Sequence, residues 1–303
     1  MKKICFGVDI GGTAVKMGLV DEKGVLLKDV EFPSPKDPDA MFDEIAGQIA
    51  GILKEFPNAR CVGVGVGVPG PVPDHAHVHG CVNLGWGVVN VAEGLRVRTG
   101  LPVLVENDAN LAAFGEMWQG AGRGHRNLVM LTVGTGVGGG VIADGRIVTG
   151  AVGAGGEVGH MPMPWHTDWP CTCGKFGCLE VTSSATGIIR AARQFPPFSQ
   201  MEHVTAKDVF DAAREGNADA RQVVAEAARC LGTAAAIIGC VVNPELFVIG
   251  GGVSAAGEML LAPVREAYRQ QVFPPSRGAD FVQATLGNRA GIYGGAGLFL
   301  CEV

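Results

Sequence analysis

The hydrophobic pattern of the first third of the chain predicts a β-meander. Residues 4–10 form an apolar, β-prone run that predicts a strand, and a Gly-Gly-Thr turn at 11–13 leads into a return strand at 17–20. A second turn at 21–24 leads into a third strand over "VLLKDVEF", residues 25–32. We therefore expect three sequential antiparallel strands whose first turn is rich in glycine.

Helical periodicity follows this meander and dominates the last third of the chain. Residues 37–56, "DPDAMFDEIAGQIAGILKEF", place their apolar residues on one face. Later helices are predicted at 185–193, 206–215, 218–242, 255–270 with Ser254 as the cap, and 291–301. Buried strands are predicted over "CVGVGVGVPGP" and "PELFVIGGG".

The meander occurs a second time, in "LVMLTVGTGVGGGVIADGRIV" from residue 128 to 148. A duplicated device of this kind predicts two related lobes, each directing a backbone turn toward a shared cleft. The glycines join strand to strand, whereas those of a dinucleotide fold open a helix, and the G-x-x-x-x-G-K-[ST] pattern of a P-loop does not occur.

Glycine is the unusual feature of the composition, with 47 copies among 303 residues. These glycines gather at the ends of hydrophobic runs, where they allow a ligand to approach the backbone closely. This repeated arrangement indicates a chain built around a phosphate-bearing ligand.

Charge and hydropathy exclude two classes of partner. A formal net charge of −6, with no Lys/Arg-rich run, excludes a nucleic-acid-binding surface. Asp9 interrupts the first apolar run, and "NPE" at 243–245 ends the most apolar later one too early for a membrane span. We expect a cytoplasmic protein with no membrane partner.

Three of the nine cysteines cluster with a histidine. Cys171, Cys173 and Cys178 follow His160 closely, whereas the other six cysteines are isolated in apolar surroundings and are expected to be buried thiols. A disulfide, a reactive thiol centre and a metal site are all compatible with this spacing, and a reducing compartment favours the metal site.

The first glycine turn carries groups that bind phosphate. Gly11, Gly12 and Thr13 offer backbone N–H groups and a hydroxyl, and Lys16 adds a positive charge. Asp9, directly before the turn, is suited to holding Mg²⁺ through water. The alternative is an ordinary hairpin turn with a capping aspartate.

The motif "ENDAN", residues 106–110, contains the best candidate base. Asp108 could accept a proton from a sugar hydroxyl, and Asn107 could offer its amide to a neighbouring hydroxyl. Helix N-capping before "ANLAAFGE" is the alternative, and both roles fit within one motif. Glu106 is expected to be structural.

With both hairpins, "ENDAN" and the cysteine segment taken together, the chain resembles the ROK family of sugar kinases, in particular the bacterial glucokinase type. The motifs that carry the resemblance are "VENDANLAAFGE", "TVGTGVGGG" and "GGEVGHM…CTCGKFGCLE". The resemblance implies an actin/hexokinase-like α/β fold of two lobes. We assign 1–107 with the C-terminal helix 291–303 to the small lobe, and 108–290, with the zinc segment 157–180, to the large lobe.

The same resemblance implies roles for individual residues. Asp108 would be the general base. The sugar would be bound by Gly70, Asn83, Asn107, Asp108, Glu157, His160 and Glu180. ATP and its phosphates would be bound by Asp9, Gly11, Gly12, Thr13, Lys16, Thr135, Gly136, Gly251 and Gly252. A structural Zn²⁺ would be held by His160, Cys171, Cys173 and Cys178, a closed tetrahedral set with no open position for catalysis.

These expectations describe an ATP- and Mg²⁺-dependent hexose kinase that converts glucose to glucose 6-phosphate. The alternative substrates are fructose, allose, mannose and N-acetylmannosamine. Polyphosphate is an alternative phosphoryl donor, and a non-catalytic sugar-sensing protein is an alternative class of function. The family's repressors carry an N-terminal helix-turn-helix, whereas this sequence begins at the phosphate hairpin. The family also implies a homodimer or larger oligomer.

A histidine triplet, His75, His77 and His79, is expected to share one face of a solvated strand without binding metal.

Overall fold

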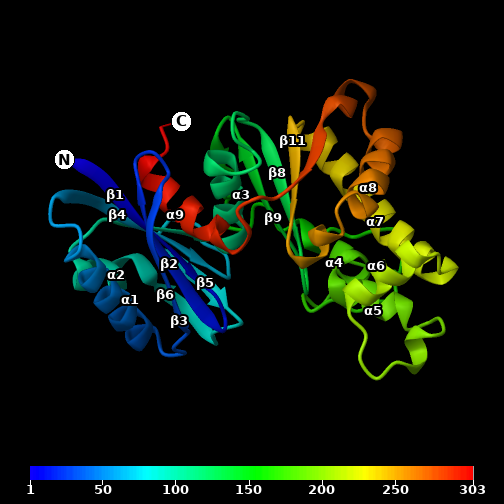
Figure 1. Cartoon of the computed structure of the whole chain (residues 1–303), viewed down its shortest axis with the longest axis horizontal. Coiled ribbons are helices and arrows are strands. Elements are labelled where there is room, and N and C mark those ends of the chain that lie inside the picture. Colours follow the sequence, from blue (N-terminus) through cyan, green and yellow to red (C-terminus); the bar gives the residue numbers. More distant parts are fainter. Residues whose placement is uncertain (303) are drawn as a thin grey trace. The chain divides into compact units, whose positions relative to one another are not determined.

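The structure, a computed structural model, describes residues 1–302 and divides into two compact units. The first unit contains Met1–Arg126, Gly140–Gly156 and the C-terminal segment from Thr285. The second unit contains Asn127–Gly139 and Glu157–Ala284 (Figure 1). The chain passes from the second unit to the first within strand β9 (Val137–Ala143).

The first unit is a sheet with helices on both faces. Its elements are β1 (Lys2–Ile10), β2 (Ala14–Asp21), β3 (Leu26–Pro33), α1 (Pro38–Leu53), β4 (Ala59–Val68), β5 (His77–Cys81), β6 (Trp86–Asn90), α2 (Val91–Thr99), β7 (Val103–Asn107), α3 (Asp108–Gln119), β10 (Arg146–Ile147) and α9 (Ala290–Leu300). Helices α1 and α2 pack on each other, and α9 packs on β1 and β4 (Figure 1).

The second unit is mostly helical. Its elements are β8 (Leu128–Val133), α4 (Leu179–Ser183), α5 (Ala185–Ala192), α6 (Ala206–Glu215), α7 (Ala218–Val242), β11 (Leu246–Gly250), α8 (Glu258–Gln271) and β12 (Asp280–Gln283). Helix α7 packs against α8, α6 and α4 and is buried along most of its length.

The two five-stranded sheets have the same strand order. The first runs β3-β2-β1-β4-β7 and the second β10-β9-β8-β11-β12. In both, an antiparallel meander provides one side and parallel strands that follow helices provide the other. The predicted duplication is therefore present as a repeated topology, and the mixed α/β class is confirmed.

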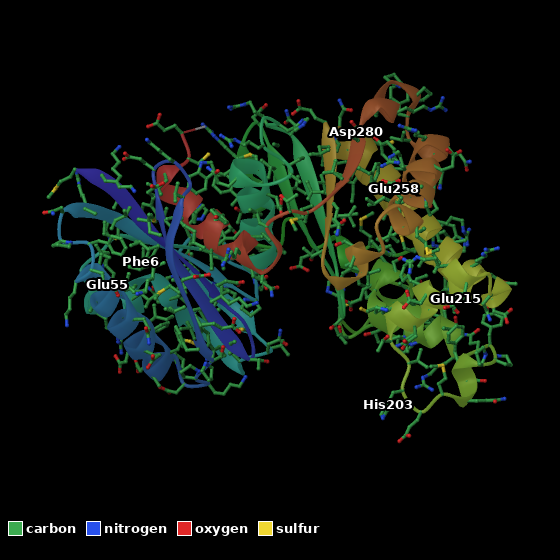
Figure 2. The ribbon with its side chains drawn as sticks, viewed as in Figure 1. Phe6, Glu55, His203, Glu215, Glu258 and Asp280 are labelled. Carbon is green, nitrogen blue, oxygen red and sulfur yellow. The ribbon has the colours of Figure 1, made fainter. Side chains whose placement is uncertain are left out.

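Alternation along β1 separates two packing layers. One face of β1 enters the core that α1 and α2 cover, through Ile4, Phe6, Val8 and Ile10. Figure 2 shows Phe6 inside this unit and Glu55 at its surface. The intervening positions face α9, where Cys5 packs with Ile292 and Ala296 of that helix. This is the period of two expected for a strand buried on both faces.

Glycine on the α9 face of the sheet allows the helix to approach the strands. A Cβ atom at Gly65 would lie 1.9 Å from the Gly295 carbonyl oxygen, and one at Gly7 would lie 1.8 Å from the Ile292 carbonyl oxygen. Both neighbours are backbone atoms, which cannot turn aside as a side chain can. The strand glycines "GVGVGV" are therefore required by packing.

Helix α7 meets the length and composition of a membrane span, but 72% of its apolar window is buried within the structure, as in a core helix. Asn243 ends the helix in the left-handed conformation, with φ of 49°, at the "NPE" sequence.

Most of the predicted elements are confirmed, and two local details are wrong. Ser254 does not cap the helix that follows: it lies in a 3₁₀ turn, its hydroxyl donates to the Gly251 carbonyl, and α8 begins at Glu258 after Gly257. His75 does not share a strand face with His77 and His79, because β5 begins at His77 and His75 has a left-handed backbone (φ 58°).

The assignment of 1–107 with 291–303 to a small lobe and of 108–290 to a large lobe stays a prediction. The compact units group segments by contact, and they assign α3 to the first unit because it packs against α9. The predicted C-terminal helix corresponds to α9, and Val303 lies outside the described residues.

The packing of α9 predicts opposite effects for two Gly→Ala substitutions. Gly65→Ala places a methyl group against helix backbone and should lower the free energy of unfolding by about 3 kcal/mol or more. Gly47→Ala lies on the exposed face of α1 with no atom within 4 Å of the new Cβ, and should raise it by about 0.5–1 kcal/mol. Urea unfolding of both variants measures the contrast, and equal stabilities would contradict this account.

Candidate functional site

The first glycine turn is held by its neighbours in the first unit. The Gly11 amide donates to the Ala14 carbonyl at 3.0 Å, and the Ser34 hydroxyl donates to the Gly11 carbonyl at 2.6 Å. Lys36 Nζ donates to the carbonyls of Gly12 and Asn83, at 2.7 and 3.0 Å. Lys36 thus links the predicted phosphate turn to the predicted sugar residue Asn83, a contact that no local sequence pattern indicates.

Asp9 lies at the end of β1 on the side of the sheet that α9 covers. A Cβ at Gly291 of α9 would lie 2.9 Å from the Asp9 carboxylate. Burial raises the pKa of the Asp9 carboxyl above its ordinary value, and the ammonium of Lys16 opposes part of that shift. Lys16 pairs across the strands with Asp9 and lines a cavity of about 410 Å³ together with Arg289.

Asp108 is the first residue of α3, directly after β7. Its Oδ1 accepts from the Ala109 amide at 2.8 Å. A Cβ at Gly67 would lie 3.5 Å from Asp108 Cα and 3.7 Å from Asp9 Oδ1, so these two carboxylate residues flank one glycine of β4. The structure therefore brings Asp9 and Asp108 together at the carboxyl end of the first sheet.

Asn107 is the helix cap, as one of the two interpretations of "ENDAN" predicted. Its Oδ1 accepts from the amides of Ala109 and Asn110, and its Nδ2 donates to the Gly70 carbonyl at 3.3 Å. Asn107 thus joins Gly70 to the start of α3. Asn83 lies at the first turn, where a Cβ on Gly12 would be 3.1 Å from Asn83 Cβ.

Glu106 is fully buried, and its contacts fit the structural role that was predicted. Its carboxylate accepts from the Asn107 amide at 2.9 Å, from Asn110 Nδ2 at 3.1 Å and from the Thr149 hydroxyl at 3.1 Å. His75 Nδ1 lies 3.6 Å from the same carboxylate. This network supports the backbone on which Asp108 stands.

The second glycine turn joins β8 to β9. The Gly134 amide donates to the Gly136 carbonyl at 2.9 Å, and the Thr186 hydroxyl donates to the Thr135 carbonyl at 2.9 Å. Gly251 lies against the end of β8 with φ of 78°, where a Cβ would lie 2.4 Å from the Val133 carbonyl oxygen.

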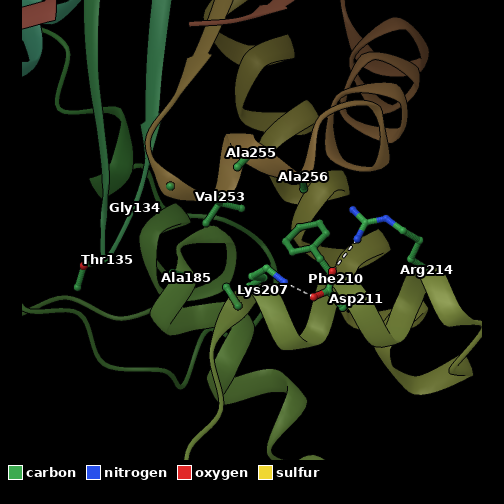
Figure 3. Close-up of a pocket in the computed structure, with 12 residues that line it drawn as sticks. Gly134, Thr135, Ala185, Lys207, Phe210, Asp211, Arg214, Val253, Ala255 and Ala256 are labelled. Carbon is green, nitrogen blue, oxygen red and sulfur yellow. Dashed lines mark hydrogen bonds and ion pairs between the residues drawn. The ribbon is translucent and has the colours of Figure 1, made fainter. Parts of the chain in front are cut away.

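A cavity of about 660 Å³ opens beside this turn in the second unit (Figure 3). Gly134, Thr135 and Gly252 line one part of it, and α6 supplies a wall that the sequence did not indicate. On that wall Asp211 pairs with both Lys207 and Arg214, and the ring of Phe210 faces the cavity (Figure 3). The volume and the mainly apolar lining suit a small molecule of nucleoside size.

Glu180 lies directly beside the second glycine turn. Its Oε2 accepts from the Val137 amide at 3.1 Å, and a Cβ at Gly136 would lie 2.1 Å from the same oxygen. The predicted sugar carboxylate and the predicted phosphate turn are therefore neighbours within one unit. Only glycine at position 136 leaves the carboxylate in this position.

The four predicted metal ligands converge. One donor atom from each of His160, Cys171, Cys173 and Cys178 lies within 4.8 Å of the others. Cys173 Sγ and Cys178 Sγ are 3.7 Å apart, and Cys171 Sγ is 3.5 Å from His160 Nδ1. A tetrahedral zinc ion with ordinary bond lengths requires separations of about 3.8 Å and about 3.5 Å for such pairs.

The chemistry of the cluster also fits a divalent cation. Burial, reinforced by the neighbouring thiols of Cys171 and Cys173, raises the pKa of Cys178 to about 12. Such a thiol is deprotonated readily only beside a strong positive charge, which a bound metal ion supplies. His160 presents Nδ1 to the cluster, while its Nε2 lies 3.9 Å from a Glu157 carboxylate oxygen.

The histidine triplet forms no comparable site within residues 1–302. His77 Nδ1 is 2.7 Å from an Asp74 carboxylate oxygen, His75 faces Glu106, and His79 is exposed on β5. All nine cysteines in this part of the chain are free thiols. The expectation that the six isolated cysteines are buried is confirmed for Cys5, Cys81 and Cys230, but it is wrong for Cys240, which is exposed, and Cys61 and Cys301 are half-buried.

Comparison with known proteins extends these observations. The model of the ROK family matches residues 5–302. The chain is 41% identical to the glucokinase of Halalkalibacterium halodurans over 96% of this chain and 93% of that one. It is 32% identical to the N-acetylmannosamine kinase of Salmonella arizonae over 88% of this chain and 89% of that one.

A solved structure agrees in fold as well as in sequence. The ROK family glucokinase of Streptomyces griseus, in complex with glucose and AMPPNP, is 34% identical and matches with a TM-score of 0.79. The match covers 98% of this chain and 99% of that one.

The raised pKa of Asp9 predicts that this residue opposes folding at neutral pH. The folded state retains a proton on Asp9 to higher pH than the unfolded chain, so the ionised carboxylate lowers stability above the raised pKa. Asp9→Asn should therefore stabilise the protein at pH 7 by about 1 kcal/mol, and the gain should shrink as the pH falls through the raised pKa.

Urea unfolding without nucleotide or Mg²⁺, repeated at several pH values, measures this effect. Asp280→Asn, at an exposed position, is the matched control and should leave the pH dependence unchanged. A destabilised Asp9→Asn variant would contradict the prediction.

Proposed function

The chain belongs to the ROK family, and from this membership we propose that it is an ATP-dependent hexose kinase whose preferred acceptor is glucose. The observation that carries the proposal is the whole-length similarity to glucokinases, including one solved with glucose and a nucleotide analogue. The identity to the N-acetylmannosamine kinase is lower, which makes that sugar the second candidate acceptor.

Asp108 is the proposed base. Its carboxylate would accept the proton of the sugar 6-hydroxyl as the oxygen attacks the γ-phosphate. Its place at the first position of α3, beside a buried network of Glu106, Asn107 and Asn110, supports this role because the backbone there is firmly held. Asn107 would act by holding Gly70 and α3, with its second amide hydrogen offered to the sugar.

The remaining sugar contacts are assigned to two sets of residues. In the second unit, Glu157 and Glu180 would accept hydrogen bonds from sugar hydroxyls, and His160 would present Nε2 to the ring. In the first unit, Asn83 would donate its amide and Gly70 would leave room for the sugar. Carboxylates that bracket a rigid cluster are well suited to recognise a fixed pattern of hydroxyls.

The nucleotide is assigned to the glycine turns and to the cavity in Figure 3. Thr135, Gly136, Gly251 and Gly252 would face the phosphates and nucleoside in the second unit, and of these Thr135 and Gly252 line the cavity. Gly11, Gly12, Thr13 and Lys16 would meet phosphate in the first unit. Asp9 would hold Mg²⁺ through water, and this ion would supply charge neutralisation on the phosphate oxygens.

A structural Zn²⁺ is part of the proposal. His160, Cys171, Cys173 and Cys178 would hold it, and the ion would supply rigidity to the segment between Glu157 and Glu180.

The repeated strand order supports the proposal that the two lobes have an actin/hexokinase-like fold. Free thiols on all nine cysteines are compatible with the proposed cytoplasmic setting.

The kinase proposal predicts a selective loss of catalysis in Asp108→Asn. Removing the base should lower kcat by about a hundredfold to ten-thousandfold while glucose binding is retained. ADP release from Mg·ATP measures this against glucose, mannose, allose, fructose and N-acetylmannosamine, with polyphosphate as a second donor. Asp280→Asn serves as the control at an exposed aspartate.

The panel separates the alternatives. Highest turnover with another sugar would replace glucose as the substrate, and sugar binding without turnover of any member would favour a sensor. An Asp108→Asn variant with wild-type kcat would remove Asp108 as the base while leaving the kinase activity in place.

The zinc proposal predicts one Zn²⁺ per chain in the purified protein. Cys173→Ser should abolish the bound metal, because three ligands of this kind hold zinc far more weakly than four, and should lower Tm by several degrees. Cys240→Ser, an exposed cysteine in the same unit outside the cluster, should change neither. Elemental analysis and thermal unfolding provide the test, and equal zinc content in both variants would refute the assignment.

A further inference from the structure

The loop that carries the metal ligands has a second set of attachments, which involve no ligand. Three aromatic residues of this loop contact charged residues of the helices below it. His166 Nε2 lies 2.8 Å from Glu226 Oε1 on α7. The guanidinium of Arg229 lies 4.0 Å from the ring centre of Trp165, and that of Arg190 lies 5.2 Å from the ring centre of Trp169.

His166 is the centre of this arrangement. Its ring stacks on Trp169 with centroids 3.8 Å apart and planes inclined by 21°. Its backbone is left-handed, with φ of 51°, an uncommon conformation for a residue with a side chain. Such a conformation persists only where surrounding contacts hold it, and it often marks a functional position.

Trp169 connects this arrangement to the metal cluster. Its side chain packs against Cys171, Cys178 and Val181, and the Gly177 amide donates to its carbonyl at 2.9 Å. A continuous series of contacts therefore runs from α7 through Glu226, His166 and Trp169 to two of the cysteines.

We propose that these six residues form an aromatic tether, consisting of Trp165, His166 and Trp169 on the loop and Arg190, Glu226 and Arg229 on the helices. The tether orders the loop on α5 and α7 independently of the metal, and so presets the cysteines and the two carboxylates at their borders. Its members are positioning residues, because none of them is a metal ligand or a proposed sugar contact. The consequence for sugar binding rests on the proposed function, whereas the consequence for loop order and metal does not.

The physical reason lies in the structure of the loop. Between Met161 and Cys178 the chain forms turns and isolated bridges with no helix or long strand. Its backbone hydrogen bonds join parts of the loop to one another, such as the Met163 amide to the Gly177 carbonyl, and do not attach the loop to the helices, whereas the aromatic contacts do. A binding site that is ordered beforehand loses less conformational entropy on binding. Residues that orient metal ligands from outside the coordination shell commonly change metal affinity by about tenfold to a hundredfold.

The test compares His166→Asn with His203→Asn in the full-length protein. Asparagine tolerates the left-handed backbone of position 166, so the variant removes the stack and the contact with Glu226 without adding strain. His203 is an exposed histidine on a loop of the same unit (Figure 2) and is the matched control. Glu226→Gln and Trp169→Phe test the same contacts with smaller changes.

Two readouts do not depend on catalysis. Hydrogen exchange of peptides covering residues 161–178 should be at least about tenfold faster in His166→Asn than in wild type, both with and without Zn²⁺. Zinc release into excess 4-(2-pyridylazo)resorcinol should also be about tenfold faster. Glu226→Gln should change both in the same direction, and the double variant should add little to His166→Asn, because the two residues act through one contact.

A third readout separates positioning from a loss of folded protein. The KM for glucose should rise severalfold in His166→Asn, while kcat and the KM for ATP stay near wild type. A loss of folded protein would instead lower the apparent kcat and leave the KM for glucose unchanged.

Wild-type exchange and zinc release in both His166→Asn and Glu226→Gln would overturn the tether. If His166→Asn fails to fold, Glu226→Gln and Trp169→Phe decide the question with the same measurements. If the wild-type protein phosphorylates no sugar, the proposed function fails, yet exchange of residues 161–178 still decides whether the tether exists.

Discussion

Helix α9 lies on strands β1 and β4 at a separation that admits no side chain between their backbones. Glycine at positions 7 and 65 makes this possible, and the same helix meets α3, where a Cβ on Gly115 would lie 2.2 Å from the Ala290 carbonyl oxygen. Asp9 occupies the next α9-facing position of β1 after Gly7, and Asp108 opens α3. Both candidate carboxylates of the first unit therefore take their places from one helix packed through glycine, and the burial that raises the pKa of Asp9 follows from the same contact.

The second unit fixes its candidate residues by a different means. Glu180 lies in the first turn of α4 and is held against the glycine turn by the Val137 amide, whereas Glu157 lies in irregular chain before a 3₁₀ turn. Helix packing cannot fix a segment of this kind. Two kinds of contact order this segment in place of secondary structure. Three thiols and an imidazole converge within it, and its aromatic residues contact α7. A rigid helical layer beneath the loop makes such anchoring effective.

Local patterns predicted what depends on local chemistry. The apolar periodicity identified the strands of both meanders and helices such as α6 and α7, and the spacing of the cysteines identified a ligand set that the fold brings together. Contacts that depend on tertiary register were missed. Lys36 reaches Gly12 and Asn83 only because the chain returns to the first turn before α1, and Asp211 faces the cavity only because α6 lies beside the second turn. Ser254 was misplaced because capping patterns do not reveal a 3₁₀ turn inserted before the helix.

The two five-stranded sheets share a strand order but differ in the residues that lie at the ends of their strands. In the first sheet Asp9 lies near the end of β1 and Asp108 lies directly after β7, and helix α9 covers Asp9. In the second sheet β11 ends in glycines, and the space beside the turn remains open as a cavity of about 660 Å³. Proton transfer benefits from a carboxylate on a rigid, partly dry support, whereas nucleotide binding requires exposed backbone donors and volume. One topology thus occurs twice with different groups at its edge: carboxylates in the first sheet, as the proposed base and Mg²⁺ contact require, and open backbone turns in the second, as the proposed nucleotide site requires.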